Sequence, residues 1–134
     1  MLDTSSKKKV ETFIHPSGFV EQHYSGYQTL NSVLSGLRDL EKHVNKVVKD
    51  QGKPALILVD TTALTKVDLS RKMLGARQKG VQMMKDLDFK KAAIYGPLAI
   101  QILVNTMAKI AGVSNRIHVF ENRVDAICWL KSKQ

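Results

Sequence analysis

Apolar and polar residues alternate at the start of the chain and then recur with helical spacing. The alternation over Val10–Ile14 and Phe19–Tyr24 predicts two strands, and His15-Pro16-Ser17-Gly18 between them suits a type I turn, so we expect a β-hairpin. From Leu30 to Lys49 apolar residues recur every three or four positions. This spacing predicts a long amphipathic helix that ends near Gly52.

The rest of the chain alternates between short apolar segments and helical patterns. Ala55–Val59 is apolar without alternation, as in a strand covered on both faces. The following segments are predicted as a polar loop, a helix, a strand, a helix, a strand and a helix, over residues 60–69, 70–87, 91–95, 96–111, 116–120 and from 122 onward. The order β-β-α-β-α-β-α-β-α predicts an α/β fold with a mixed sheet of about five strands and about four helices, in which the later strands are parallel.

Length and composition indicate one domain. The chain has 134 residues, of which we expect 1–9 to form a flexible basic tail and 10–134 to form a single domain. Cys128 has no second cysteine to pair with, which fits a reducing compartment. No segment has the pattern of a signal peptide, and no apolar run approaches the roughly 20 residues of a membrane-spanning helix. We therefore expect a cytoplasmic protein without a transmembrane segment.

Motifs that mark catalysis are missing from the sequence. The histidines have no metal-ligand spacing to one another or to Cys128. There is no nucleophile elbow, no phosphate-binding glycine loop and no dinucleotide fingerprint. We therefore expect a protein that is not an enzyme and that uses neither a metal nor a cofactor.

The segment from Asp60 to Lys72 has the most informative polar pattern. Asp60 closes a buried strand, and Asp68 and Ser70 stand where the next helix begins. The Ser70 hydroxyl suits an N-cap, because it can accept a hydrogen bond from a free backbone N–H of the first turn. Capping is the simplest role for this serine, and a regulatory role is the alternative.

From about Val10 to Leu130 the chain resembles STAS-type domains, in particular the bacterial anti-sigma-factor-antagonist-like (SpoIIAA-like) branch. The resemblance rests on the element order and on Asp68-Leu69-Ser70, at the spacing where the antagonists carry Asp-Ser-Ser-Gly. It rests also on the end of the chain. There Ile117–Asn122 and Ala126–Leu130 are similar to the ending of the antagonist-like branch, which consists of a strand, a Phe, an acidic cap and Ala-x-x-Trp-Leu. The sequence departs from the family pattern at Leu69 and Arg71.

The resemblance implies a non-enzymatic regulatory or protein-interaction domain whose phosphorylated residue is Ser70. Thr61 and Thr62 are weaker candidates in the same loop. A phosphate at a helix N-terminus is favoured by the free N–H groups, and Arg71 and Lys72 are placed to pair with it. The acidic Asp60 and Asp68 complete this candidate switch, and the partner is an unidentified protein.

The helix over residues 96–111 has more apolar surface than one face of a sheet can cover. A stripe somewhat over 100° wide suffices for a helix packed on a sheet, and this one is about twice as wide. The surplus must meet a neighbouring helix, a second copy of the chain or an apolar ligand. An alternative function is therefore a carrier or sensor of a small lipid-like ligand. The branch that the chain resembles is related in fold to the domain of Sec-type lipid-transfer proteins. The residues that would form this face are Ile100, Val104, Met107, Ala108 and Ala111.

The chain is strongly basic, with 21 Lys and Arg against 12 Asp and Glu and a formal net charge of +9. Such charge favours nucleic acid or an anionic membrane as partner. No aromatic residues are interleaved with the basic ones, however, and no nucleic-acid-binding signature is present. We therefore interpret the basic residues as a solvated face, do not expect nucleic acid binding, and keep charge-driven binding as the weakest hypothesis.

Overall fold

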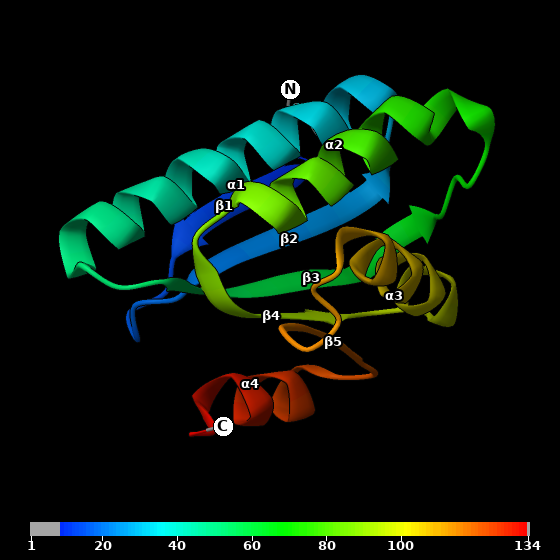
Figure 1. Ribbon diagram of the computed structural model, residues 1–134. Coiled ribbons are helices and arrows are strands. Elements are labelled where there is room, and N and C mark those ends of the chain that lie inside the picture. Colours follow the sequence, from blue (N-terminus) through cyan, green and yellow to red (C-terminus); the bar gives the residue numbers. More distant parts are fainter. Residues whose placement is uncertain (1–8, 134) are drawn as a thin grey trace, which may run out of the picture.

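The computed structural model describes residues 9–133 as a five-stranded sheet with helices on both faces (Figure 1). This confirms the predicted α/β class, the opening hairpin and the mixed sheet. Residues 1–8 of the predicted tail lie outside the described part. In chain order the elements are β1 (Val10–Ile14), β2 (Val20–Tyr27), α1 (Leu30–Gln51), β3 (Ala55–Lys66), the 3-10 turn η2 (Arg71–Met73), α2 (Leu74–Asp86), β4 (Phe89–Tyr95), α3 (Leu98–Ala111), β5 (Ile117–Phe120) and α4 (Arg123–Lys131).

The strands lie in the sheet in the order in which they occur in the chain. β1 and β2 form the predicted antiparallel hairpin, and the Gly18 N–H donates to the His15 carbonyl over 2.7 Å in its turn. β2, β3, β4 and β5 are parallel neighbours. Each parallel strand is reached through a helix, as connections between parallel strands require.

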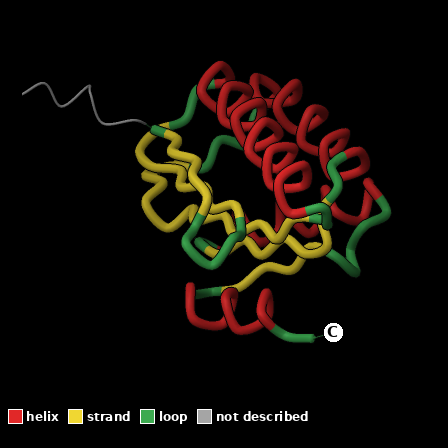
Figure 2. Tube along the Cα trace, turned by 90° about the vertical axis from the view of Figure 1, so that its left-hand side faces the viewer, coloured by secondary structure: helices red, strands yellow, loops and turns green. Residues whose placement is uncertain are grey.

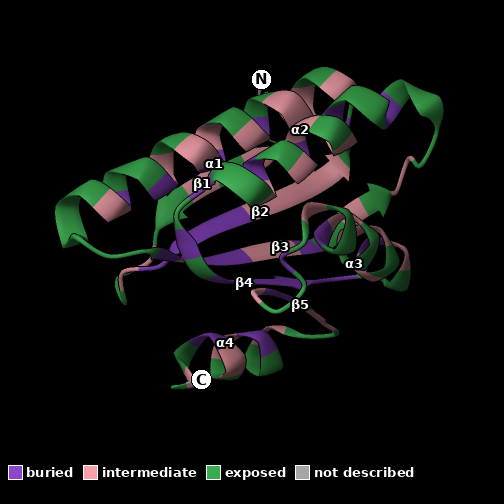
Figure 3. Ribbon diagram, in the orientation of Figure 1, coloured by how far each residue is buried: buried purple, intermediate pink, exposed green. Residues whose placement is uncertain are grey.

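The helices form two unequal layers. α1, α2 and α3 cover one face of the sheet, and α4 alone covers part of the other (Figures 1 and 2). Because side chains alternate along a strand, Ile57 of β3 points toward the three helices and Leu58 points toward α4. Figure 3 shows the resulting pattern, with buried residues in the central strands and exposed residues on the outer sides of the helices.

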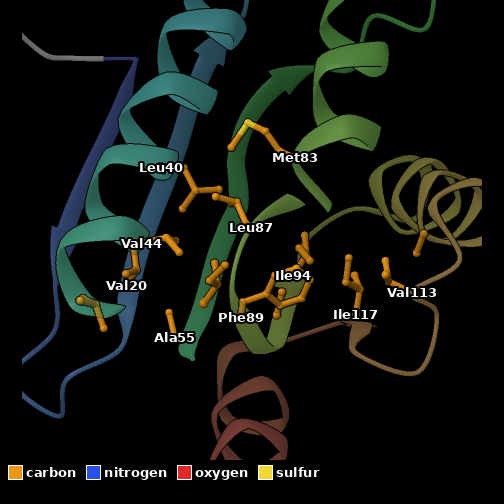
Figure 4. Close-up of a cluster of buried hydrophobic side chains, with 14 of the residues drawn as sticks. Val20, Leu40, Val44, Ala55, Met83, Leu87, Phe89, Ile94, Val113 and Ile117 are labelled. Atoms are coloured by element: carbon orange, nitrogen blue, oxygen red, sulfur yellow. The ribbon is translucent and has the colours of Figure 1, made fainter. Parts of the chain in front are cut away.

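The larger core lies between the sheet and the three-helix layer. Leu40 of α1, with Met83 and Leu87 from the end of α2, extends into the space above the strands (Figure 4). Phe89 and Ile94 of β4 meet them from the sheet. This core holds α1 and α2 side by side. Within the described residues, no helix is long and apolar enough to cross a bilayer.

The polar stretch predicted as a loop over 60–69 is largely a strand. β3 continues to Lys66 because its second half pairs with β2, with Asp60 opposite His23 and Lys66 opposite Tyr27. Several residues of this half are exposed, such as Thr62, whose N–H and hydroxyl bind Asp60, and this accounts for the polar composition of the stretch. Length and polarity alone therefore did not distinguish it from a loop.

The predicted helix start at Ser70 also needs correction. A 3-10 turn follows Ser70, and the α-helix begins at Leu74. The Ser70 side chain makes no capping hydrogen bond. The Asn122 cap is confirmed, because its side chain accepts a hydrogen bond of 2.9 Å from the Asp125 N–H.

Candidate functional site

A cavity of about 240 Å³ lies between the sheet and the three-helix layer. Most of the side chains around it are aliphatic or Met, and they come from strands β2 to β5 and helices α1 to α3. The sheet contributes Gln22, Tyr24, Ile57, Val59, Thr61, Leu64, Lys66, Phe89, Ala92, Ile94 and Ile117. The helices and connections contribute Gln28, Val33, Leu37, Leu40, Val67, Asp68, Gly80, Met83, Met84, Leu87, Ile100, Leu103, Val104 and Met107.

The α3 residues predicted for an apolar face divide into two groups. Ile100, Val104 and Met107 line the cavity. Ala108 and Ala111 instead pack into the core and do not border the cavity. Part of the apolar surface of α3 therefore packs on the core and on α2, and another part borders the cavity.

Gly80 of α2 determines how closely α3 approaches that helix. A Cβ built on Gly80 would lie 2.5 Å from the terminal methyl carbon of Met107. The methyl group therefore rests on bare backbone, where any larger residue would displace it. Met107 and its neighbour Leu103 form the wall on this side of the cavity.

Two buried amides border the cavity, and the Nε2 group of each donates to the protein. Gln22 donates from Nε2 to the Gly36 carbonyl over 2.7 Å and to the Thr12 hydroxyl over 2.9 Å. Gln28 donates from Nε2 to the Ser25 carbonyl over 2.7 Å. Because these donors are used, the amides shape the cavity rather than offer hydrogen bonds to a ligand.

Tyr24 supplies an unused polar group at the cavity. Its hydroxyl forms no hydrogen bond with any described residue, and a Cβ on Gly36 would lie 3.1 Å from it. Burial, with a smaller effect of Asp39, raises the pKa of Tyr24 well above its ordinary value. The phenol is therefore protonated at neutral pH and can donate to a ligand.

The cavity reaches the surface at the carboxyl end of β3. Lys66 and Val67 border it there, and the Lys66 side chain is exposed. The Lys66 ammonium lies 6.0 Å from the centre of the Tyr27 ring and makes no ion pair within the described residues. Ligands of open α/β sheets commonly bind at the carboxyl ends of parallel strands.

The predicted switch residues are only partly brought together. Ser70, Arg71 and Lys72 are all exposed on the connection between β3 and α2. Asp68 Oδ1 accepts the Ser70 N–H over 2.8 Å, and the hydrogen bonds from the Ser70 side chain and backbone lower the pKa of Asp68. Arg77 donates to the Ser70 carbonyl over 3.2 Å. The serine thus lies on an ordered polar connection rather than at the N-terminus of an α-helix.

Asp60 and the two threonines lie apart from Ser70, in β3. Thr61 is buried and its hydroxyl donates to the Tyr95 carbonyl over 2.9 Å, so the prediction that places Thr61 in a loop is wrong. Thr62 is exposed, and its N–H and hydroxyl both bind Asp60 Oδ1, at 2.8 and 2.6 Å. Burial opposes these bonds, but they lower the pKa of Asp60 below its ordinary value.

A polar cluster under α4 was not predicted from the sequence. Arg123 binds Glu21 through two hydrogen bonds and also donates to the Tyr95 hydroxyl over 3.2 Å. His23 lies 2.5 Å from Glu21 and 3.9 Å from Asp60. These residues come from three strands and a helix, so no local motif contains them. Among residues 9–133, no group of three or more His, Cys, Asp or Glu is arranged to hold a metal ion.

Comparison with models of known protein families finds no match for this chain, and a search of curated proteins also finds none. The STAS-like resemblance therefore stays a prediction that rests on the motifs and on the element order.

Proposed function

We propose that this chain is a STAS-like domain that binds one small amphiphilic ligand, as a carrier or a sensor. The observation that supports this function is the largely apolar cavity beneath α1, α2 and α3, which reaches the surface beside Lys66. Pockets for small molecules have this character, with mostly apolar walls and a few polar groups that orient the ligand.

The cavity favours an apolar occupant over water. An apolar cavity of about 150 Å³ engineered in another protein stays dry and binds benzene. The cavity here measures about 240 Å³, and the polar amides at its edge are already bonded. Each methylene group moved into it from water contributes about 0.8 kcal/mol. A short alkyl chain therefore provides most of the binding free energy.

The polar groups indicate what the other end of the ligand carries. The Tyr24 hydroxyl is a protonated donor, and the Lys66 ammonium is a cation without an ionic partner in the described part of the chain. A carboxylate accepts hydrogen bonds from both types of group. We therefore assign the ligand to the class of fatty-acid-like carboxylates, with the alkyl chain inside and the carboxylate toward Tyr24 or Lys66.

The test is a titration of the full chain with a fluorescent medium-chain fatty acid. Val104→Phe places a ring in the cavity, and we expect it to weaken binding at least about tenfold, because the alkyl chain loses its space. Val124→Phe on α4 is the control, since Val124 is 70% exposed and lies outside the cavity. Native mass spectrometry of protein from its own host identifies a ligand that copurifies. Equal affinity of Val104→Phe and wild type, or no binding by wild type, overturns the proposal.

A second candidate function, a regulatory module acting through Ser70, is favoured by the position of Asp68. Asp68 borders the cavity and also accepts the Ser70 N–H. A ligand at the cavity mouth therefore acts on the exposed connection that carries Ser70, Arg71 and Lys72. We expect ligand to slow hydrogen exchange over residues 66–73. We also expect Ser70→Glu to change the affinity for a partner or ligand, whereas Ser70→Ala should leave that affinity unchanged. Identical exchange with and without ligand, together with identical affinities of both variants, rejects this role.

A further inference from the structure

A second apolar feature lies on the outside of the helix layer. A groove of about 500 Å³ runs between α2 and α3, with Leu69, Leu74, Val81, Ile102 and Ile110 among its lining residues. Large aliphatic side chains beside it are exposed to solvent, including Leu98 at 68%, Ile110 at 65% and Ile102 at 58%. Contiguous exposed apolar surface of this kind marks an interaction site more often than a solvated face.

The exposed aliphatic residues form a stripe on α3 that is separate from the cavity face. Leu98, Ile102 and Ile110 are spaced by multiples of four, which places them along one side of the helix. The cavity residues Ile100 and Val104 face the sheet instead. Figure 3 shows exposed residues along the outer surface of α3. α3 therefore has two apolar faces, of which one is internal and the other has no partner within the described chain.

The charges around this stripe are predominantly positive, with Asp68 beside Leu69 as an exception. Lys109 is the only charged residue of α3. Between Asp68 and Asp86 every charged residue is basic, and Arg77 lines the groove itself. A second copy docked on this face would bring the same positive charges together, which opposes a homodimer here. An anionic partner has the complementary charge.

We propose that this face docks on the surface of an anionic lipid bilayer. Leu98, Ile102 and Ile110 enter the boundary between headgroups and acyl chains, while Arg71 and Lys72 contact anionic headgroups. An exposed apolar stripe flanked by Lys and Arg is the combination that binds proteins to membrane interfaces. The basic residues around α2 are then a docking surface rather than merely a solvated face. This inference stands on the outer groove and its charges and does not require the cavity ligand.

The test is flotation of the full chain with two kinds of vesicle, one of phosphatidylcholine alone and one of phosphatidylcholine mixed with phosphatidylglycerol in equal parts. We expect binding to the anionic vesicles only, with weaker binding at physiological than at low ionic strength. Ile102→Asp combined with Ile110→Asp should reduce the bound fraction at least about tenfold, because a charge replaces the inserted side chains. Val124→Asp, on the exposed side of α4, is the matched control and should bind like wild type.

The electrostatic contribution is tested by Arg71→Glu combined with Lys72→Glu. Loss of each basic residue near an anionic surface weakens binding about fivefold, so the pair should reduce it at least about 25-fold. Lys42→Glu with Lys46→Glu, both exposed on α1, is the control with the same change in net charge.

Four results overturn the docking proposal. Two concern vesicles: no binding to the anionic vesicles, and binding that the aspartate variant retains. The other two reassign the groove to a protein: binding of a glutamate-rich amphipathic peptide that is tighter than binding of the vesicles, and a wild-type dimer that Ile102→Asp dissociates in light scattering. Vesicle binding without fatty-acid binding rejects the cavity proposal alone, and the reverse result rejects the docking proposal alone.

Discussion

Arg123 of α4 and Glu21 of β2, which are 102 positions apart in the chain, form a bidentate ion pair beneath the sheet. Their Nη1–Oε2 and Nη2–Oε1 distances are 2.6 and 3.1 Å. The Glu21 side chain is 2% exposed, whereas that of Arg123 is 39% exposed. The pair links the last helix to the second strand and leaves the opposite face of the sheet to the three helices and the cavity.

Replacing Arg123 by alanine should lower the free energy of unfolding by about 3 kcal/mol. Glu21 would then be a buried carboxylate without its main partner. Because Arg123 is partly exposed, we expect a loss of stability at the low end of the range observed when one partner of a buried ion pair is removed. Guanidinium denaturation measures the change. Lys131→Ala, at an exposed position of the same helix, serves as the control and should stay within about 0.5 kcal/mol of wild type. A loss of less than about 1 kcal/mol for Arg123→Ala contradicts the prediction.

Glu21 should also make stability depend on pH. Although its burial acts in the opposite direction, hydrogen bonds from Arg123 and His23 lower its pKa below the ordinary value of 4.5. A carboxyl whose pKa is lower in the folded state stabilises the fold above its unfolded-state pKa, and this stabilisation is lost as the pH falls through the folded-state value. Wild type should therefore lose more stability than Glu21→Gln between neutral pH and about pH 3, in denaturant titrations at each pH. Parallel curves for the two proteins would show that Glu21 contributes nothing to the acid response.

Lys91 should stabilise the C-terminal end of α4 on the sheet. Its buried ammonium donates to the Trp129 and Ser132 carbonyls, at 2.8 and 3.0 Å, and to the Ser132 hydroxyl at 2.6 Å. Lys91→Met removes the donor to the Ser132 carbonyl and hydroxyl and one of the donors to the Trp129 carbonyl, so we expect a loss of about 2 kcal/mol and faster hydrogen exchange in α4. Lys90→Met, at the exposed neighbouring position, should change neither quantity. Similar exchange in both variants would mean that α4 does not depend on Lys91.

Two glycines should respond in opposite directions to alanine. Gly96 has φ +154°, and a Cβ on it would collide with the Thr61 hydroxyl group, so Gly96→Ala should destabilise the fold by about 2–3 kcal/mol. Gly75 is an exposed residue of α2 whose added Cβ would meet only a Leu30 methyl carbon at 3.9 Å, so Gly75→Ala should stabilise by about 0.5–1 kcal/mol. Thermal unfolding of both variants measures the difference. A destabilising Gly75→Ala would show that backbone entropy does not dominate at that site.

Local periodicity was sufficient for most of the fold. The helix predicted to start at Leu30 does start there, because the apolar spacing begins with that residue and Thr29 caps it. The second half of β3 was missed, since Asp60–Lys66 forms a strand by pairing with β2 and has too many polar residues to look like a buried strand. The strand periodicity that is visible in Val10–Ile14 is absent there.

The candidate site was predictable only where the apolar pattern of a single helix indicated it. The surplus apolar surface of α3 pointed to Ile100, Val104 and Met107, and these residues line the cavity. Tyr24 and Lys66 were missed, because their positions at the cavity depend on the register of β2 against β3. The contact between Arg123 and Glu21 was beyond local analysis for the same reason, since it depends on the final placement of α4.

Leu103 and Met107 border both the internal cavity and the outer groove, so the partition between them is a single layer of side chains. Both side chains are flexible, and Met107 rests on the bare backbone of Gly80 rather than against a fixed side chain. Only these side chains separate a molecule in the groove from the cavity, and passage between the two would need no break in the hydrogen bonds of α2 or α3. Exchange across this partition therefore depends on side-chain rotation at positions 103 and 107 rather than on movement of the helices.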